Sequence, residues 1–320
     1  MTKILLTRKW PDEVEQHIRS RHDVTFNVED KPMAIEALRE AARTFDVICP
    51  TVTDRLPPEL FQQASCRVRM ICNYGAGFEH IDLDACKAAG IVVTNTPDVL
   101  TDATAEIAML LMLMAARRAG EGERELRDRK WSGWRPTHLM GTLVTGKTLG
   151  LVGFGRIAQR TAEMARGFGM RILYHSRRPA DAGIEGRLQA SYRASLDELL
   201  EQSDFVSLHC PGGKETEKLI DAERLQRMRT SAFLINTARG SVVDEEALAA
   251  ALHGGRIAGA GLDVFCNEPH VAQLLLNAPG LVLLPHLGSA TTETRVAMGM
   301  RAVANLEQWL AGEAPGDRIA

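Results

Sequence analysis

Three side chains in the last third of the chain have the types needed to bind a small anion and move one proton. Arg239, Glu268 and His286 each follow an apolar segment that predicts a buried strand. In an open parallel sheet, ligands bind outside the carboxyl ends of the strands. A guanidinium, a carboxylate and an imidazole at that edge predict a site that binds a carboxylate and protonates a carbonyl oxygen.

Each of these residues also has a structural explanation. Taken singly, an arginine or a glutamate after a strand is more often a member of a surface ion pair, and a histidine beside a proline is at least as often structural. Their positions after three consecutive predicted strands favour the functional explanation. Reduction of a carbonyl would also require a hydride donor.

A glycine turn predicts where that donor binds. Residues 147–169 read as a strand, a turn with the spacing G-x-G-x-x-A, and a helix. Gly153 permits the tight turn, Gly155 lets the backbone approach a pyrophosphate, and Ala158 keeps the helix close to the strand. The positive end of the helix beginning near Arg156 would face the diphosphate. We predict a dinucleotide site, the alternative being a turn that serves packing alone.

The residues after the second strand of this unit indicate which nicotinamide cofactor is used. An NAD site normally has Asp or Glu there to accept a hydrogen bond from the ribose 2′-hydroxyl. This chain has Ser176, Arg177 and Arg178, and its next acid is Asp181. Arginine donates several charge-assisted hydrogen bonds to a phosphate. The segment therefore predicts a preference for NADPH, with NADH possible, unless the two arginines only mark a solvated turn.

A second anion site is suggested by the segment that runs from Asn73 to Gly77, with the sequence NYGAG. Its glycines expose backbone N–H groups, which can form a nest for a carboxylate. The alternative is an ordinary turn between a strand and a helix.

Short apolar runs alternate with helical stretches in both halves of the chain, which predicts α/β architecture with doubly wound parallel sheets. A helix over 101–118, apolar nearly all round, is expected to be buried. The terminal helix, 292–310, is expected to return to the first domain. The predicted strands are 4–7, 24–26, 47–49, 70–73 and 92–94 in the first half, and 148–152, 171–175, 205–208, 232–236, 259–264 and 282–284 in the second.

Composition excludes several classes of protein. The chain has 320 residues, 45% of them apolar and 25% charged, as in an ordinary globular protein. A net charge of −3 gives no case for binding nucleic acid or an acidic membrane surface. Its longest apolar run, 107–116, is too short to span a bilayer. Six cysteines without C-x-x-C spacing, and a first strand with no apolar signal region before it, favour a reduced cytoplasmic setting without a metal site.

Motifs along nearly the whole chain resemble one family. They are NYGAGFEHID, NTPDVLTDATAE, GKTLGLVGFGRIAQ, LINTARGSVVDEEAL, GLDVFCNEP and PHLGSATTETR. The chain resembles the D-2-hydroxyacid dehydrogenases and, among them, the glyoxylate/hydroxypyruvate reductases. The resemblance implies two Rossmann-like domains with an active-site cleft between them, and a homodimer built on the long central helix. The expected domains are 1–98 plus 289–320 for the flavodoxin-like substrate-binding domain and 99–288 for the NAD(P)-binding Rossmann domain.

The same resemblance implies roles for individual residues. Arg239, Glu268 and His286 would be catalytic, and Ala76 and Gly77 would bind the substrate together with Arg239 and His286. The cofactor would be bound by Gly153, Phe154, Gly155, Arg156, Ile157, Ser176, Arg177, Arg178, Thr237, Ala238, Asp263, Leu287 and Gly288.

Some features depart from the family pattern. Ala158 replaces the commoner third glycine, and residues 270–280 lack the proline-rich sequence often seen after the catalytic Glu-Pro. Trp131 and Trp134 resemble aromatic residues that approach the neighbouring subunit's site in some relatives, although they could simply anchor a loop.

We therefore expect a cytoplasmic, NADPH-dependent reductase that converts glyoxylate to glycolate and hydroxypyruvate to D-glycerate, with His286 as the proton donor. One alternative is a dehydrogenase for another 2-hydroxy acid, such as 3-phosphoglycerate or D-lactate. The other is a nucleotide-sensing regulator that kept the fold and lost turnover.

Overall fold

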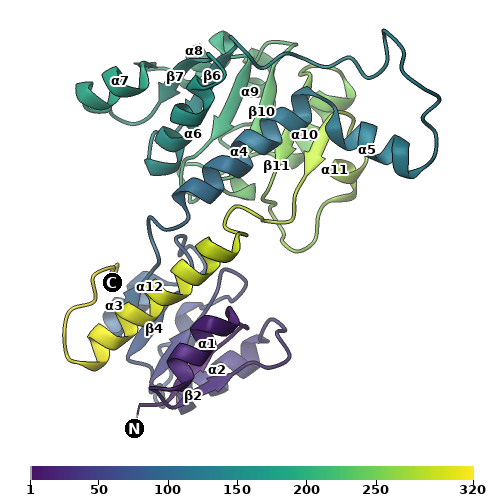
Figure 1. Ribbon diagram of the computed structural model, residues 1–320. Coiled ribbons are helices and arrows are strands. Elements are labelled where there is room, and N and C mark those ends of the chain that lie inside the picture. Colours follow the sequence, from purple (N-terminus) through teal and green to yellow (C-terminus); the bar gives the residue numbers. More distant parts are fainter. Residues whose placement is uncertain (1) are drawn as a thin grey trace. The chain divides into compact units, whose positions relative to one another are not determined.

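The computed structural model describes residues 2–320 and divides the chain into two compact units (Figure 1). Unit 1 contains the chain up to Leu100 together with Ala290–Ala320, and unit 2 contains Thr101–Ser289. The domain boundaries expected from sequence were 98/99 and 288/289. The terminal helix thus belongs to the same unit as the first strands.

Unit 1 is built on a five-stranded parallel sheet in the order β2-β1-β3-β4-β5. Its strands are β1 (Ile4–Leu6), β2 (Val24–Phe26), β3 (Val47–Cys49), β4 (Met70–Cys72) and β5 (Val92–Thr94). Its helices are α1 (Asp12–Arg19), α2 (Ile35–Thr44), the 3-10 turn η1 (Pro58–Leu60), α3 (Leu83–Ala88) and α12 (Thr292–Leu310).

Alternation along the strands of unit 1 supplies two cores. Ile4 and Leu6 on β1 face α1 and α12, whereas Leu5 between them faces α2. Both faces of the sheet are therefore covered, which explains why the strands read as continuous apolar runs.

Unit 2 is built on a seven-stranded parallel sheet in the order β12-β11-β10-β9-β6-β7-β8. Its strands are β6 (Thr148–Val152), β7 (Arg171–His175), β8 (Ala190–Tyr192), β9 (Phe205–Leu208), β10 (Phe233–Asn236), β11 (Gly259–Leu262) and β12 (Leu281–Leu283). Its helices are α4 (Thr101–Ala116), α5 (Ala119–Arg127), α6 (Arg156–Arg166), α7 (Ala182–Leu188), α8 (Leu196–Gln202), α9 (Ala222–Arg227), η2 (Gly240–Val242), α10 (Glu245–His253) and α11 (Gln273–Leu276).

Helices α4 and α6 cover one face of this sheet, and α8, α9 and α10 cover the other (Figure 1). The strand order reverses between β6 and β9, which is where a doubly wound sheet opens a crevice for a ligand. The predicted fold class, α/β with two doubly wound parallel sheets, is confirmed.

Several expected elements differ in detail. Strand β8 and helix α5 were not predicted, because β8 is a three-residue edge strand and α5 buries no residue, so neither has an apolar pattern. Helix α4 ends at Ala116 rather than 118, followed by Arg118 in the left-handed region at φ 53°. Strand β12, expected to be buried, is a half-buried edge strand. Within residues 2–320, no helix has the length and apolar character needed to cross a membrane.

Candidate active site

Glu268 and His286 form a hydrogen-bonded pair. The two residues are 18 positions apart in the chain, and His286 Nδ1 lies 2.7 Å from Glu268 Oε2. The other carboxylate oxygen, Oε1, accepts a hydrogen bond from the Phe265 N–H at 2.9 Å. The Glu268 side chain keeps 33% of its exposure and the His286 side chain 37%, so the pair remains accessible to a ligand.

The electrostatic environment keeps Glu268 ionised. Burial acts to raise the pKa of Glu268, whereas the hydrogen bond and charge interaction with His286 lower it. The Phe265 N–H and the charge of Arg239 lower it further, so this pKa lies below its ordinary value. A carboxylate can only accept, so Nδ1 of His286 must be the donor in this pair.

Asp263, directly after β11, fixes the backbone of the segment that carries His286. Its Oδ1 accepts from the Leu287 N–H at 2.7 Å and its Oδ2 from the Gly288 N–H at 2.8 Å. The His286 N–H donates to the Asp263 carbonyl at 2.9 Å, and His286 itself adopts φ 55°. Burial raises the pKa of Asp263 above its ordinary value, although the N–H groups of Leu287 and Gly288 favour the charged form.

Arg239 follows β10 on a turn that approaches the β11 loop closely. Asn236 Nδ2 donates to the Arg239 carbonyl at 2.8 Å, and the Arg239 guanidinium donates to the Ala238 carbonyl at 2.7 Å. The next residue, Gly240, faces the Phe265 backbone so closely that a Cβ there would lie 1.9 Å from the Phe265 carbonyl carbon. The loop that begins with Arg239 and the loop that leads to Glu268 are thus in direct backbone contact.

The glycine turn has the geometry expected of a dinucleotide site. Gly153 adopts φ 86°, and a Cβ at this position would lie 2.8 Å from the Cys210 nitrogen. At Gly155, which caps helix α6, a Cβ would meet no atom within 4 Å, so the space over the helix N-terminus is open. Ala158 is fully buried, as close packing of the helix on the sheet requires.

Phe154, between the two glycines, turns its side chain into the protein. Its ring stacks on Tyr174 of β7 with centroids 3.8 Å apart. Phe154 can therefore offer a cofactor its backbone, whereas its ring anchors the turn.

Ser176, Arg177 and Arg178 line a pocket of about 600 Å³ after β7. Ser176 Oγ donates to the Arg178 carbonyl at 2.6 Å, and Tyr192 on β8 donates from its hydroxyl to the Ser176 carbonyl at 3.1 Å. The Arg177 guanidinium is exposed, with Glu215 3.8 Å away. Hydrogen bonds to main-chain carbonyls thus hold the loop, while its guanidinium groups face solvent.

Two features of this region were missed in the sequence. His209 and Cys210 follow β9 and pack under Gly153, and burial lowers the pKa of His209 to about 4. Their signal was a buried strand followed by Cys-Pro-Gly-Gly at the point where the strand order reverses. Thr104 on α4 donates to the Gly288 carbonyl at 2.9 Å and so helps to hold the segment after His286.

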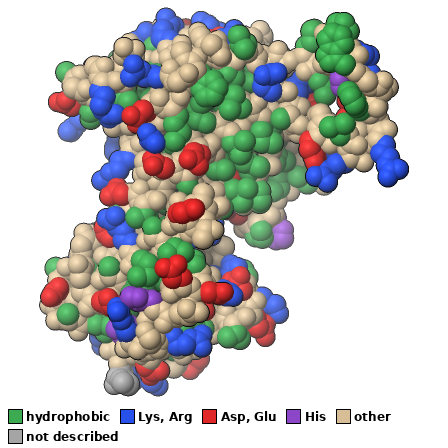
Figure 2. Space-filling view, in the orientation of Figure 1, with side chains coloured by type: hydrophobic (Ala, Val, Ile, Leu, Met, Phe, Trp, Pro, Cys, Tyr) green, Lys and Arg blue, Asp and Glu red, His purple; other side chains and the backbone are tan. Residues whose placement is uncertain are grey.

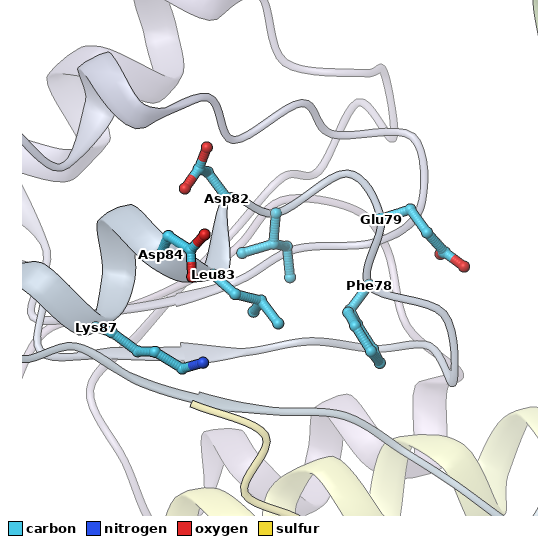
Figure 3. Close-up of a pocket in the computed structure, with 7 residues that line it drawn as sticks. Phe78, Glu79, Asp82, Leu83, Asp84 and Lys87 are labelled. Atoms are coloured by element: carbon cyan, nitrogen blue, oxygen red, sulfur yellow. The ribbon is translucent and has the colours of Figure 1, made fainter. Parts of the chain in front are cut away.

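Ala76 and Gly77 lie in unit 1, on a turn after β4. Both are half-buried, and Gly75 before them is buried. A hollow of about 390 Å³ follows this turn and is lined by Phe78, Glu79, Ile81, Asp82, Leu83, Asp84 and Lys87 (Figure 3). Three carboxylates against one ammonium would repel a small anion, so we assign no substrate role to this hollow.

Comparison with known proteins identifies the family. The NAD-binding domain of the D-isomer specific 2-hydroxyacid dehydrogenases matches residues 109–288. The chain belongs to this family. It is an oxidoreductase of the 2-hydroxy acid class whose unit 2 contains the nicotinamide-binding domain.

Similar proteins cover nearly the whole chain. A glycerate dehydrogenase from Hyphomicrobium methylovorum is 42% identical over 300 residues, or 94% of this chain and 93% of that protein. A glyoxylate reductase from Thermococcus kodakarensis is 43% identical over 318 residues, or 98% and 94%. The structure of an NADPH-dependent glyoxylate/hydroxypyruvate reductase from Sinorhizobium meliloti with NADP and malonate is 34% identical, with a TM-score of 0.86, and the match covers 100% of this chain and 97% of that one.

Proposed function

We propose that this enzyme reduces small 2-oxo acids with NADPH, converting glyoxylate to glycolate and hydroxypyruvate to D-glycerate. The observation that carries the proposal is the hydrogen bond between Glu268 and His286, which pairs an ionised carboxylate with an imidazole in a chain of this family. The similarity to a glyoxylate reductase and to a glycerate dehydrogenase supports this choice of substrates.

In this proposal His286 supplies the proton. Its Nδ1–H is held by Glu268, which leaves Nε2–H to donate to the carbonyl oxygen as negative charge develops there. The nearby carboxylate stabilises the charged imidazolium before transfer. After transfer, the neutral ring remains oriented by the same hydrogen bond.

Arg239 is proposed to bind the substrate carboxylate and to polarise its ketone. A guanidinium is planar and permanently charged, which suits two parallel hydrogen bonds to a carboxylate. The turn that contains Arg239 is in contact with the Phe265 backbone, so the loops of Arg239 and Glu268 lie against each other. The roles of Ala76 and Gly77 stay predictions.

The residues of unit 2 fit a nicotinamide dinucleotide. The open space over Gly155 and the N-terminus of α6 suits a pyrophosphate, and Thr237 has a buried hydroxyl without a hydrogen-bond partner among residues 2–320. When bound, the reduced cofactor supplies the hydride. Ser176, Arg177 and Arg178 would contact a 2′-phosphate, and a related reductase is described as NADPH-dependent.

A homodimer is proposed from exposed apolar side chains of unit 2. Figure 2 shows hydrophobic side chains gathered around α4 and on the segment that includes α5. The large exposed residues there are Leu110, Leu126, Trp131, Trp134, Met140 and Leu143. Whether either tryptophan reaches a partner's site, and the cytoplasmic location, stay predictions.

One panel of initial rates tests the proposed reaction. NADPH and NADH are each combined with glyoxylate, hydroxypyruvate, pyruvate and phosphohydroxypyruvate, and nicotinamide absorbance is followed. We expect the highest kcat/KM with NADPH and one of the first two acids. Faster turnover of either of the other acids would support a different 2-hydroxy acid dehydrogenase, and no turnover with any acid would support the nucleotide-sensing alternative.

A further inference from the structure

Side-chain amides bind three consecutive carbonyl groups of the turn that contains Ala76 and Gly77. Asn73 Nδ2 donates to the carbonyl oxygens of Gly75 at 3.0 Å and Gly77 at 2.9 Å. Asn95 Nδ2 donates to the carbonyl of Ala76 at 2.8 Å. Two asparagines, one after β4 and one after β5, therefore hold three consecutive peptide groups.

These contacts determine where the N–H groups of the turn point. In a planar trans peptide, the carbonyl and the following N–H point in opposite directions. Fixing the carbonyls of residues 75, 76 and 77 therefore directs the N–H groups of Ala76, Gly77 and Phe78 away from the asparagines. None of these three N–H groups donates a hydrogen bond to an acceptor within residues 2–320. Successive N–H groups in such a turn form a concave anion site.

Further hydrogen bonds hold the side chain of Asn73 and the backbone of Asn95. Asn73 is fully buried, and its Oδ1 lies 3.1 Å from His80 Nε2. Asn95 keeps 8% of its exposure, and its main-chain carbonyl accepts a hydrogen bond from Asn305 Nδ2 at 3.3 Å. The reverse amide orientation of Asn73 would place its oxygen against two carbonyl oxygens, which is costly in a buried site.

We infer that Asn73 and Asn95 are positioning residues for the substrate carboxylate. They would not touch the substrate; they would hold the N–H groups of the turn convergent before it arrives, so that binding pays little reorganisation. The inference rests on the proposed function and extends it, because the expected contact of Ala76 and Gly77 with the substrate carboxylate would depend on two residues that do not touch the substrate.

Aspartate at either position tests the inference, since it keeps the shape and removes the donors. With NADPH saturating, Asn73→Asp and Asn95→Asp should each raise the KM for glyoxylate at least about tenfold, the effect of losing roughly 1.4 kcal/mol of binding. The kcat should stay within about threefold of wild type, and the Kd for NADPH, which binds unit 2, should not change.

Asn27→Asp is the matched control. Asn27 also lies in unit 1, and its Nδ2 likewise donates to two carbonyls, those of Thr7 and Lys31, both at 2.7 Å. This variant should lose a similar amount of stability, measured as Tm, and keep the wild-type KM for glyoxylate.

A substrate without a carboxylate separates carboxylate binding from general damage. The kcat/KM for glycolaldehyde should be unchanged in the two aspartate variants while that for glyoxylate falls. An equal fall for both substrates, or a wild-type KM for glyoxylate together with a lowered Tm, would overturn the inference. A wild-type enzyme that reduces no 2-oxo acid would instead refute the proposed function.

A milder variant covers the case in which an aspartate variant does not fold. His80→Leu removes the imidazole, including the ring nitrogen that lies 3.1 Å from Asn73 Oδ1. We expect it to raise the KM for glyoxylate about threefold, less than the loss of a direct donor to the turn. An unchanged KM in a folded His80→Leu enzyme would also count against the inference.

Discussion

The proposed proton donation by His286 depends on which of its ring nitrogens is hydrogen-bonded within the protein. The contact between Nδ1 and Glu268 Oε2 commits one nitrogen to the carboxylate, so only Nε2 can serve a substrate. The pKa of Glu268 is held below its ordinary value, so the carboxylate is charged throughout the neutral range. Its stabilising effect on the imidazolium is therefore present at neutral pH and is lost only when acid protonates Glu268.

Replacement of His286 tests the proton donor directly. His286→Ala should lower kcat by about 10²–10⁴-fold, the usual contribution of a general acid, and leave the Kd for NADPH near wild type. Steady-state rates and a fluorescence titration with NADPH measure the two quantities. His270→Ala is the control, because His270 is an exposed histidine of unit 2 that lies two residues after Glu268. Near-normal turnover in His286→Ala would refute the assignment.

Replacement of Glu268 tests the charge pairing. Glu268→Gln keeps an acceptor for Nδ1–H but removes the negative charge beside the imidazolium. The acid limb of the pH–kcat profile, which protonation of Glu268 produces in the wild type, should then disappear. We also expect kcat at neutral pH to fall about 10-fold or more, because the imidazolium has lost its charge partner. A profile that keeps the wild-type acid limb would show that the carboxylate charge does not act through His286.

At the scale of elements, the loop after β7 is the proposed determinant of the cofactor preference. The loop from Ser176 to Arg178 is braced by hydrogen bonds from Tyr192 and Ser176, so it presents Arg177 without ordering a flexible segment first. Arg177→Ala should raise the KM for NADPH about tenfold and leave the KM for NADH unchanged. Arg187→Ala, an exposed arginine on α7, should change neither value. Equal effects on both cofactors would contradict a 2′-phosphate contact.

The backbone contact between the β10 turn and the β11 loop has its own test. In Gly240→Ala, the new Cβ would overlap the Phe265 and Cys266 backbone, which has little freedom to move. We expect a loss of about 1–3 kcal/mol in the free energy of unfolding and a fall in kcat, because the loops of Arg239 and Glu268 separate. Gly186→Ala on α7 meets no atom within 4 Å and should be neutral or stabilising in the same denaturant titration.

At the scale of the whole molecule, α4 combines a buried face with an exposed apolar residue. Leu110 keeps 42% of its exposure on this helix, and the segment that follows α5 carries the exposed Trp131 and Trp134. Such a surface is typical of an interface. Leu110→Asp should convert a dimer to a monomer, measured by size-exclusion chromatography with light scattering. Val28→Asp, at an 87% exposed apolar residue of unit 1, should leave the mass unchanged. A monomeric wild type would refute the proposed dimer.

Local patterns in the sequence determined most of the helices and strands, and they indicated which strand each candidate site residue follows. Apolar runs predicted ten of the strands closely, and most of these strands are buried on both faces, which leaves a continuous signal. Strand β12, a half-buried edge strand, lies one residue earlier than predicted. The terminal helix was predicted with the bounds found, Thr292–Leu310, since its cap and apolar pattern are encoded locally. The glycine turn could be located because the strand and the helix that flank it lie within one βαβ unit.

Only the tertiary structure decided which side chains meet. The distance between Glu268 and His286 depends on the paths of two loops, and the amides of Asn73 and Asn95 meet the carbonyls of one turn because β4 and β5 are adjacent in the sheet. Periodicity reports the burial of a residue and says nothing of its hydrogen-bond partner. Residue types and their order thus come from the sequence, whereas pairing, orientation and charge state come from packing between segments far apart in the chain.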